Sequence, residues 1–161
     1  MNAPSPSAAL ISVSLLAAWL GAAGFVSAVI TPAAFAVLPS RALAGALVGR
    51  ALPVLFVLGI FCGVAVAVMN QSVKAERAVT RGATALALAN AAALLVAIRL
   101  RATVAAIGAP IDTLAPADPR RLAFGRMHGV SVLLLGVGLV SACVALVVLA
   151  RRVNSLISAP R

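Results

Sequence analysis

The sequence is poor in the side chains with which proteins carry out acid–base and metal chemistry. It contains one histidine, two cysteines, three acidic residues and no tyrosine among 161 residues. General acid–base catalysis needs positioned groups such as carboxylates or histidines. The three acids, Glu76, Asp112 and Asp118, all lie between the apolar segments, so no carboxylate pair is expected inside the fold. We therefore expect a protein that is not an enzyme.

Charged residues of both signs are also scarce. They make up 10% of the chain, whereas hydrophobic residues make up 63%; soluble domains have about 25% and about 45–50%. Four long apolar runs account for this composition, at residues 7–30, 53–69, 82–98 and 129–150. Each is close to the roughly 20 residues that a helix needs to cross a bilayer. The runs show no polar–apolar alternation, so helices are favoured over a closed barrel.

The predicted fold class is therefore all-α: an integral membrane four-helix bundle that forms a single transmembrane domain over residues 1–161. The predicted helices span about residues 7–37, 51–70, 82–108 and 127–152. Ser40 is a suitable cap for a short interfacial helix between the first two spans, with Arg41 and Arg50 on its polar side. Pro53 is then expected at the start of the second span.

The net charge of +10 would suggest nucleic acid in a soluble protein. Here the basic residues stand in small groups near helix ends, without interleaved aromatic residues. We expect them to meet membrane lipids, including anionic headgroups, and we expect no nucleic-acid partner. Lys and Arg are nearly balanced between the two sides, six against seven. Three of the seven, Arg99, Arg101 and Arg126, lie on helices or their edges, which leaves fewer basic residues in the links on that side. The opposite side, which holds both termini, is therefore favoured as the cytoplasmic one.

A candidate polar cluster consists of Arg126, His128 and Ser131 at the start of the last helix, together with Asn90 in the third. In one interpretation His128 binds a metal or haem, or relays protons, with Met127 as a further weak candidate ligand. In the other, which we favour, His128 is a headgroup-level histidine bonded to nearby carbonyls. His128 is the only histidine, so no metal or cofactor is predicted, and haem or copper is the alternative. Asn90 is predicted to bond between helices.

Two further features concern the helix surfaces. Arg99 and Arg101 are expected to reach the headgroups with their long side chains; the alternative is an anion or headgroup site shared with Arg126. Pairs of glycines at helical spacing predict close helix packing, at Gly21, Gly24, Gly59 and Gly63. These faces favour an accessory or packing subunit that associates with other membrane helices or with itself. The alternative function is a small transporter or a metal- or haem-handling protein that uses the Arg126/His128 cluster.

Several short motifs carry a resemblance to a known family. They are Trp19-Leu20-Gly21-Ala22 with Phe25, Thr31-Pro32-Ala33-Ala34-Phe35, and Phe124-x-Arg126-x-His128-Gly129-x-Ser131. The chain resembles a bacterial "domain of unknown function" family of four-helix membrane proteins. That family is similar to the eukaryotic transmembrane protein linked to platinum-drug resistance. The resemblance implies a four-helix bundle in the bacterial inner membrane, without an assigned biochemical activity.

Overall fold

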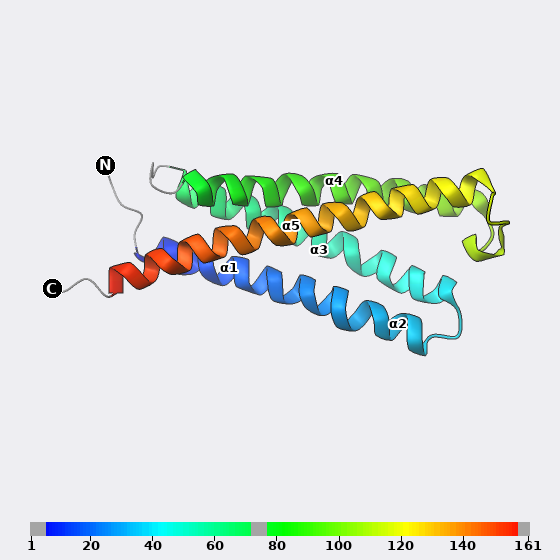
Figure 1. The fold of residues 1–161 in the computed structure, drawn as a ribbon, viewed down its shortest axis with the longest axis horizontal. Helices are drawn as coiled ribbons and strands as arrows, with labels where there is room; N and C mark the ends of the chain where they lie inside the picture. Colours follow the sequence, from blue (N-terminus) through cyan, green and yellow to red (C-terminus); the bar gives the residue numbers. More distant parts are fainter. Residues whose placement is uncertain (1–5, 72–76, 158–161) are drawn as a thin grey trace.

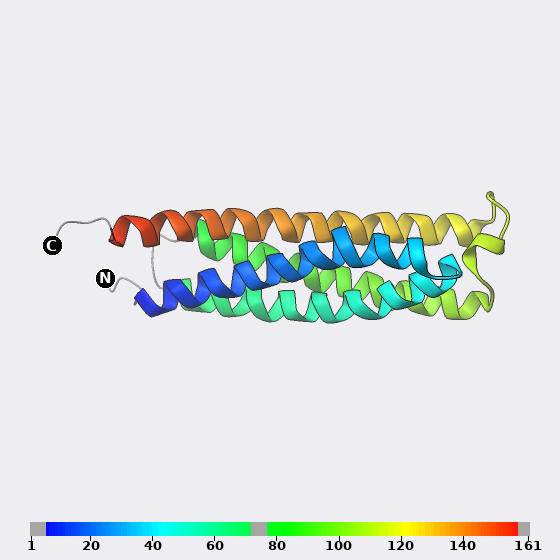
Figure 2. The same ribbon diagram turned by 90° about the horizontal axis from the view of Figure 1, so that it is seen from below.

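Four long helical rods run antiparallel along one axis in the computed structural model (Figures 1 and 2). The structure describes residues 6–71 and 77–157. The first rod consists of α1 (Pro6–Phe25), a π-helical turn η1 (Val26–Ile30) and α2 (Thr31–Val37), and the others are α3 (Arg41–Asn70), α4 (Arg77–Ile107) and α5 (Pro119–Ile157). All four are long and apolar enough to cross a membrane. The predicted all-α, four-helix membrane fold is confirmed.

The π-helical turn in the first rod accommodates Pro32. Proline lacks an N–H and its ring collides with the carbonyl of the preceding turn of a regular helix. The wider turn avoids this, because the backbone N–H of Thr31 bonds to the carbonyl of Val26, five residues back. The Thr31 hydroxyl donates to the same oxygen at 2.9 Å. The rod therefore bends without breaking, and Figure 2 shows the change of direction between α1 and α2.

The second rod begins earlier than predicted. Ser40 caps it as expected, since its hydroxyl accepts from the backbone N–H of Leu43 at 3.2 Å. The helix that starts there does not stop before the membrane span: α3 continues from Arg41 to Asn70 with Pro53 inside it. The prediction of a separate short interfacial helix, and of a second span starting near residue 51, was therefore wrong. A proline removes one helical hydrogen bond, and neighbouring turns can hold the helix together in a packed bundle.

The third rod, α4, continues past Arg99 and Arg101 as predicted and ends at Ile107. Gly108 follows with a φ of +67°, a conformation that suits glycine after the last helical residue. A short 3-10 turn, η3 (Ile111–Thr113), lies in the following link. The link between α3 and α4 contains Lys74 and Glu76, which lie outside the described residues.

The bundle core is built from small and aliphatic side chains at helical spacing. On α1 the buried positions alternate by three and four residues, at Ala9, Ser12, Leu16, Trp19 and Ala23. This spacing places them on one face of the helix. α4 packs between α3 and α5 along most of its length, whereas α2 contacts α3 and diverges from α5 (Figure 1).

Candidate functional site

The most buried polar group in the middle of the bundle is Asn90 on α4. It is 2% exposed, and its Nδ2 donates to the carbonyl oxygen of Leu86 at 2.8 Å. This bond lies within α4, so the prediction of a hydrogen bond between helices was wrong. Two glycines make room for its amide. A Cβ on Gly59 of α3 would lie 2.5 Å from its Cγ and Oδ1, and a Cβ on Gly138 of α5 would lie 3.2 Å from its Nδ2. Asn90 therefore lies between two helices that approach closely at this level.

Trp19 brings the first rod to the same level. Its indole Nε1 donates to the carbonyl oxygen of Leu55 on α3 at 3.1 Å, and its ring edge is 3.5 Å from the Cβ position of Gly138. Buried tryptophans usually need such a partner for the indole N–H. All four rods thus contribute to one layer, which we call the central layer: Trp19, Gly59, Asn90 and Gly138.

A second buried asparagine lies closer to the end where α1 begins. Asn70 at the end of α3 is fully buried. Its Nδ2 donates to the hydroxyl of Ser12 on α1 at 3.1 Å and to the carbonyl of Val66 at 2.7 Å. The Ser12 hydroxyl in turn donates to Ala8 at 2.8 Å. This chain of bonds fastens α1 to α3 at that end of the bundle.

The two asparagines share one unusual property. Within the described residues, neither Asn70 Oδ1 nor Asn90 Oδ1 has a hydrogen-bond donor, although both atoms are buried. A buried acceptor without a donor costs free energy, in about the 1–3 kcal/mol range. In each amide, Nδ2 therefore donates inside the bundle, whereas Oδ1 accepts no hydrogen bond from the described residues.

The residues of the predicted polar cluster do not come together. Arg126 and His128 are exposed, and His128 stacks on Phe124 with ring centroids 6.1 Å apart. Ser131 is buried at 8% exposure. Since Asn90 faces Gly138, it lies about 10 Å along the bundle from the level of Ser131. The placement of the cluster at the start of the last helix was wrong, because α5 begins at Pro119, two turns earlier.

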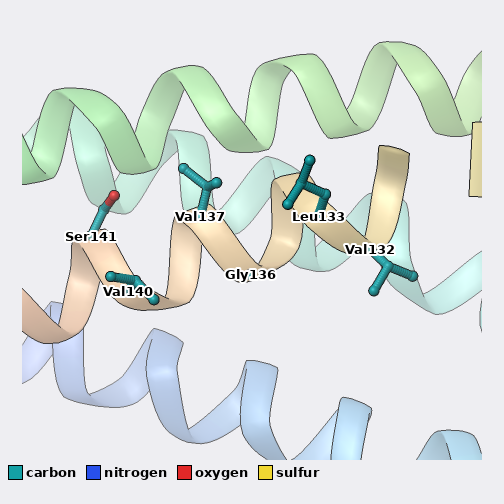
Figure 3. Close-up of a pocket in the computed structure, with 6 residues that line it drawn as sticks. All are labelled: Val132, Leu133, Gly136, Val137, Val140 and Ser141. Atoms are coloured by element: carbon teal, nitrogen blue, oxygen red, sulfur yellow. The ribbon is translucent and has the colours of Figure 1, made fainter. Parts of the chain in front are cut away.

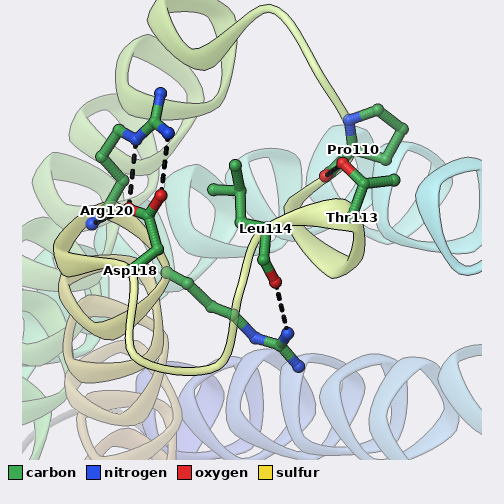
Figure 4. A network of polar contacts seen from close by, with 6 residues as sticks. Pro110, Thr113, Leu114, Asp118 and Arg120 are labelled. Atoms are coloured by element: carbon green, nitrogen blue, oxygen red, sulfur yellow. Dashed lines mark hydrogen bonds and ion pairs between the residues drawn. The ribbon is translucent and has the colours of Figure 1, made fainter.

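The sequence signal for that earlier start is Asp118-Pro119. The Asp118 carboxylate accepts from the backbone N–H of Arg120 at 2.8 Å, as helix-capping residues do. It also forms an ion pair with the Arg120 guanidinium at 2.8 Å, and Arg121 donates to the carbonyl of Leu114 at 2.7 Å (Figure 4). Proline is favoured in the first helical turn. A cap followed by proline predicts this helix start better than the beginning of the apolar run.

The bond from the Arg120 side chain, followed by that from its backbone, lowers the pKa of Asp118 from 3.8 to about 2. The ionised Asp118 side chain therefore stabilises the helix start above about pH 4, and this stabilisation is lost as the pH falls towards about 2. We expect Asp118→Ala to speed hydrogen exchange at the amides of Arg120 and Leu122 at neutral pH, because the cap is gone. Asp118→Asn is the control: it keeps a capping oxygen but no titratable charge, so acid should affect wild type more than this variant. Unchanged exchange in Asp118→Ala would contradict the capping role.

The metal-binding candidates are dispersed. Among residues 6–71 and 77–157, no three His, Cys, Asp or Glu side chains lie close enough to share a metal ion. Met127, the other weak candidate, is half-buried next to the exposed His128. His128 is therefore an exposed imidazole that belongs to no cluster of His, Cys, Asp or Glu ligands among the described residues.

The predicted packing glycines fall into two groups. Gly59 and Gly63 lie against α4, where a Cβ on Gly63 would be 2.5 Å from the carbonyl oxygen of Ala83. Around Gly21 and Gly24 of α1, nothing lies within 4 Å of the Cβ position. The first pair packs inside the bundle and the second faces outwards.

A shallow apolar groove runs along the outer side of α5 (Figure 3). We call it the α5 groove, and it is lined by Val132, Leu133, Gly136, Val137, Val140 and Ser141. Gly136 lies in the middle of this lining, and nothing lies within 4 Å of its Cβ position.

Comparison with known proteins adds one finding to this geometry. Residues 14–111 match the family described as "Domain of unknown function (DUF4149)". The chain belongs to this family. No curated protein and no solved structure shows a significant match. The part of the chain matched to DUF4149 includes three members of the central layer, Trp19, Gly59 and Asn90, and ends before α5. In this DUF4149 protein, α5 with Gly138 and the α5 groove therefore lies outside the matched segment.

Proposed function

We propose that this membrane protein is a non-enzymatic accessory subunit that associates with other membrane helices through the outer face of α1. One observation carries the proposal: a stripe of small residues faces away from the bundle. Its members, the α1 stripe, are Ser14, Ala17, Gly21 and Gly24 on α1 and Ala28 on the following turn, η1. All are exposed except the half-buried Gly24.

The spacing of the α1 stripe matches that of a packing surface. Its residues alternate by three and four, like the buried face of the same helix, and they lie on the opposite side. In lipid the hydrophobic effect does not drive helices together, so association depends on close van der Waals contact. Small residues permit that contact because they let two backbones approach. The same principle operates inside this bundle at Gly59 and Gly63.

The proposal predicts that Gly21→Leu with Gly24→Leu weakens association with the partner helix, whether that helix belongs to another protein or to a second copy. The leucine side chains would hold the two backbones apart. The measurement is chemical cross-linking in native membranes followed by purification of the full-length chain. Neither position has a neighbour within 4 Å of its Cβ, so the bundle itself should keep its thermal stability.

Gly49→Leu is the matched control, since Gly49 is an open glycine on α3. It should leave the cross-linked species unchanged. If the α1 double variant forms the same cross-linked species as wild type, or if Gly49→Leu abolishes them equally, the α1 stripe is not the contact surface.

We also propose that the protein resides in a bacterial inner membrane with both termini in the cytoplasm. The beginning of α1 and the end of α5 lie at the same end of the bundle, which supports a shared side for the termini (Figure 1). The wider similarity to proteins related to platinum-drug resistance belongs to this proposal too. It rests on the short motifs at Trp19–Phe25, Thr31–Phe35 and Phe124–Ser131, of which the last lies beyond residues 14–111.

A further inference from the structure

We propose that the α5 groove binds one acyl chain of an anionic phospholipid whose phosphate is held by Arg126. The site is independent of the α1 stripe, because it lies on a different helix and uses different residues. Two features carry the inference: the groove itself, and the placement of the exposed Arg126 in line with it.

Arg126 lies in line with the groove. It precedes Leu133 by seven residues and Val137 by eleven. At 3.6 residues per turn, these positions share one side of α5. The rise of about 1.5 Å per residue puts Arg126 about 10 Å beyond Leu133. A lipid with its chain along the groove would therefore present its headgroup to this guanidinium.

The helix register brings a second arginine to the same level. Gly138 faces Asn90, and Gly82 faces Ser141 and Ala145. Because α4 and α5 are antiparallel, moving from Gly138 to Arg126 on α5 corresponds to moving from Asn90 past Arg99 on α4. Arg99 is nine residues from Asn90, half a turn out of phase, so it projects from the side of α4 opposite Asn90, away from the α5 groove, and adds only positive charge at this level.

Neither of these two cations forms an ion pair with a carboxylate in the part of the chain that the structure describes. Both Arg99 and Arg126 are exposed. Within the described residues, the ion pair is Arg120–Asp118, which leaves neither of them paired with an acid. Guanidinium groups bind phosphate through paired N–H donors. A carboxylate-bearing helix could satisfy the charges, but the apolar groove in line with Arg126 suits a flexible acyl chain joined to a phosphate.

The test measures lipid binding to the purified full-length protein in detergent. Native mass spectrometry is recorded during titration with phosphatidylglycerol, and separately with phosphatidylcholine of the same chains. We expect preferential retention of phosphatidylglycerol, and Arg126→Gln should weaken it about fivefold, as expected for one arginine near anionic headgroups. Inorganic phosphate alone, in a separate titration, should not displace the lipid, because it cannot occupy the groove.

Gly136→Leu tests the groove and leaves the arginines in place. It should reduce retention of both lipids, since the leucine side chain would occupy the groove. Nothing lies within 4 Å of the Gly136 Cβ position, so the fold should be kept. A thermal melt of each variant checks this point. Arg77→Gln, at the opposite end of α4, is the matched charge control and should bind as wild type.

Three results would overturn the proposal. One is equal retention of the two lipids by wild type. Another is wild-type binding of phosphatidylglycerol by Arg126→Gln or Gly136→Leu. The third is complete displacement of the lipid by inorganic phosphate, which would indicate a simple anion site.

Discussion

Replacement of Gly63 by alanine is expected to lower the free energy of unfolding by about 2–3 kcal/mol. The added Cβ would lie 2.5 Å from the carbonyl oxygen of Ala83, 2.8 Å from the backbone nitrogen of Ala87 and 2.9 Å from its Cβ. Two of these atoms belong to the backbone of α4, so no side-chain rotation can relieve the contact. The helices must separate, which weakens packing along the whole α3–α4 interface.

The measurement is reversible unfolding in mixed detergent micelles, and Gly49→Ala is the matched control on the same helix. Nothing lies within 4 Å of the Gly49 Cβ position. Alanine is the better helix former by up to about 1 kcal/mol, so this variant should be neutral or slightly stabilised. Equal stability of the Gly63 and Gly49 variants would show that α3 and α4 do not approach as closely as described.

The second large effect is expected in the central layer. Gly59→Ala should destabilise the protein by about 2 kcal/mol, because its Cβ would fall 2.5 Å from the Asn90 amide. Asn90→Ala removes that amide and opens space at the same place. In the double variant the new methyl group occupies part of this space. We therefore expect the two substitutions to be coupled by about 1–2 kcal/mol, with the double variant more stable than the sum predicts.

A double-mutant cycle in the same unfolding assay measures this coupling. Combining Asn90→Ala with Gly49→Ala supplies the control, because nothing lies within 4 Å of the Gly49 Cβ position and its effect should be additive. Additive behaviour of Gly59→Ala with Asn90→Ala would mean that Asn90 does not occupy the space in front of Gly59.

The fold was largely predictable because lipid reduces the choice of structures. Long uncharged runs have few alternatives to helices in a bilayer, and Ser40 marked the start of α3 through ordinary capping. The first residue of a helix was harder to predict where two sequence signals competed. At Pro53 the sequence offered a first-turn proline, yet the packed helix continued through it. At Asp118-Pro119 the capping signal was present, and the apolar run beginning about ten residues later obscured it.

The central layer could be predicted only in part. Asn90 stands out in an apolar helix, and the spacing of Gly59 and Gly63 indicated close packing. Their contact depends on the register between α3 and α4, which no local pattern encodes. Gly21 and Gly24 illustrate the same limit. Their spacing resembles that of a packed pair, yet they face outwards, because only the three-dimensional arrangement decides which side of α1 meets α3 and α5.

The bend at the π-helical turn has a consequence for biogenesis. Both α1 before the bend and α2 after it contact α3, and the short segment between Val37 and Arg41 joins the two rods. Together with the bond between Asn70 and Ser12 near the opposite end, it makes the first two rods a helical hairpin closed at both extremities. Such a hairpin can enter the bilayer as one unit during translation and serve as the template on which the later rods assemble.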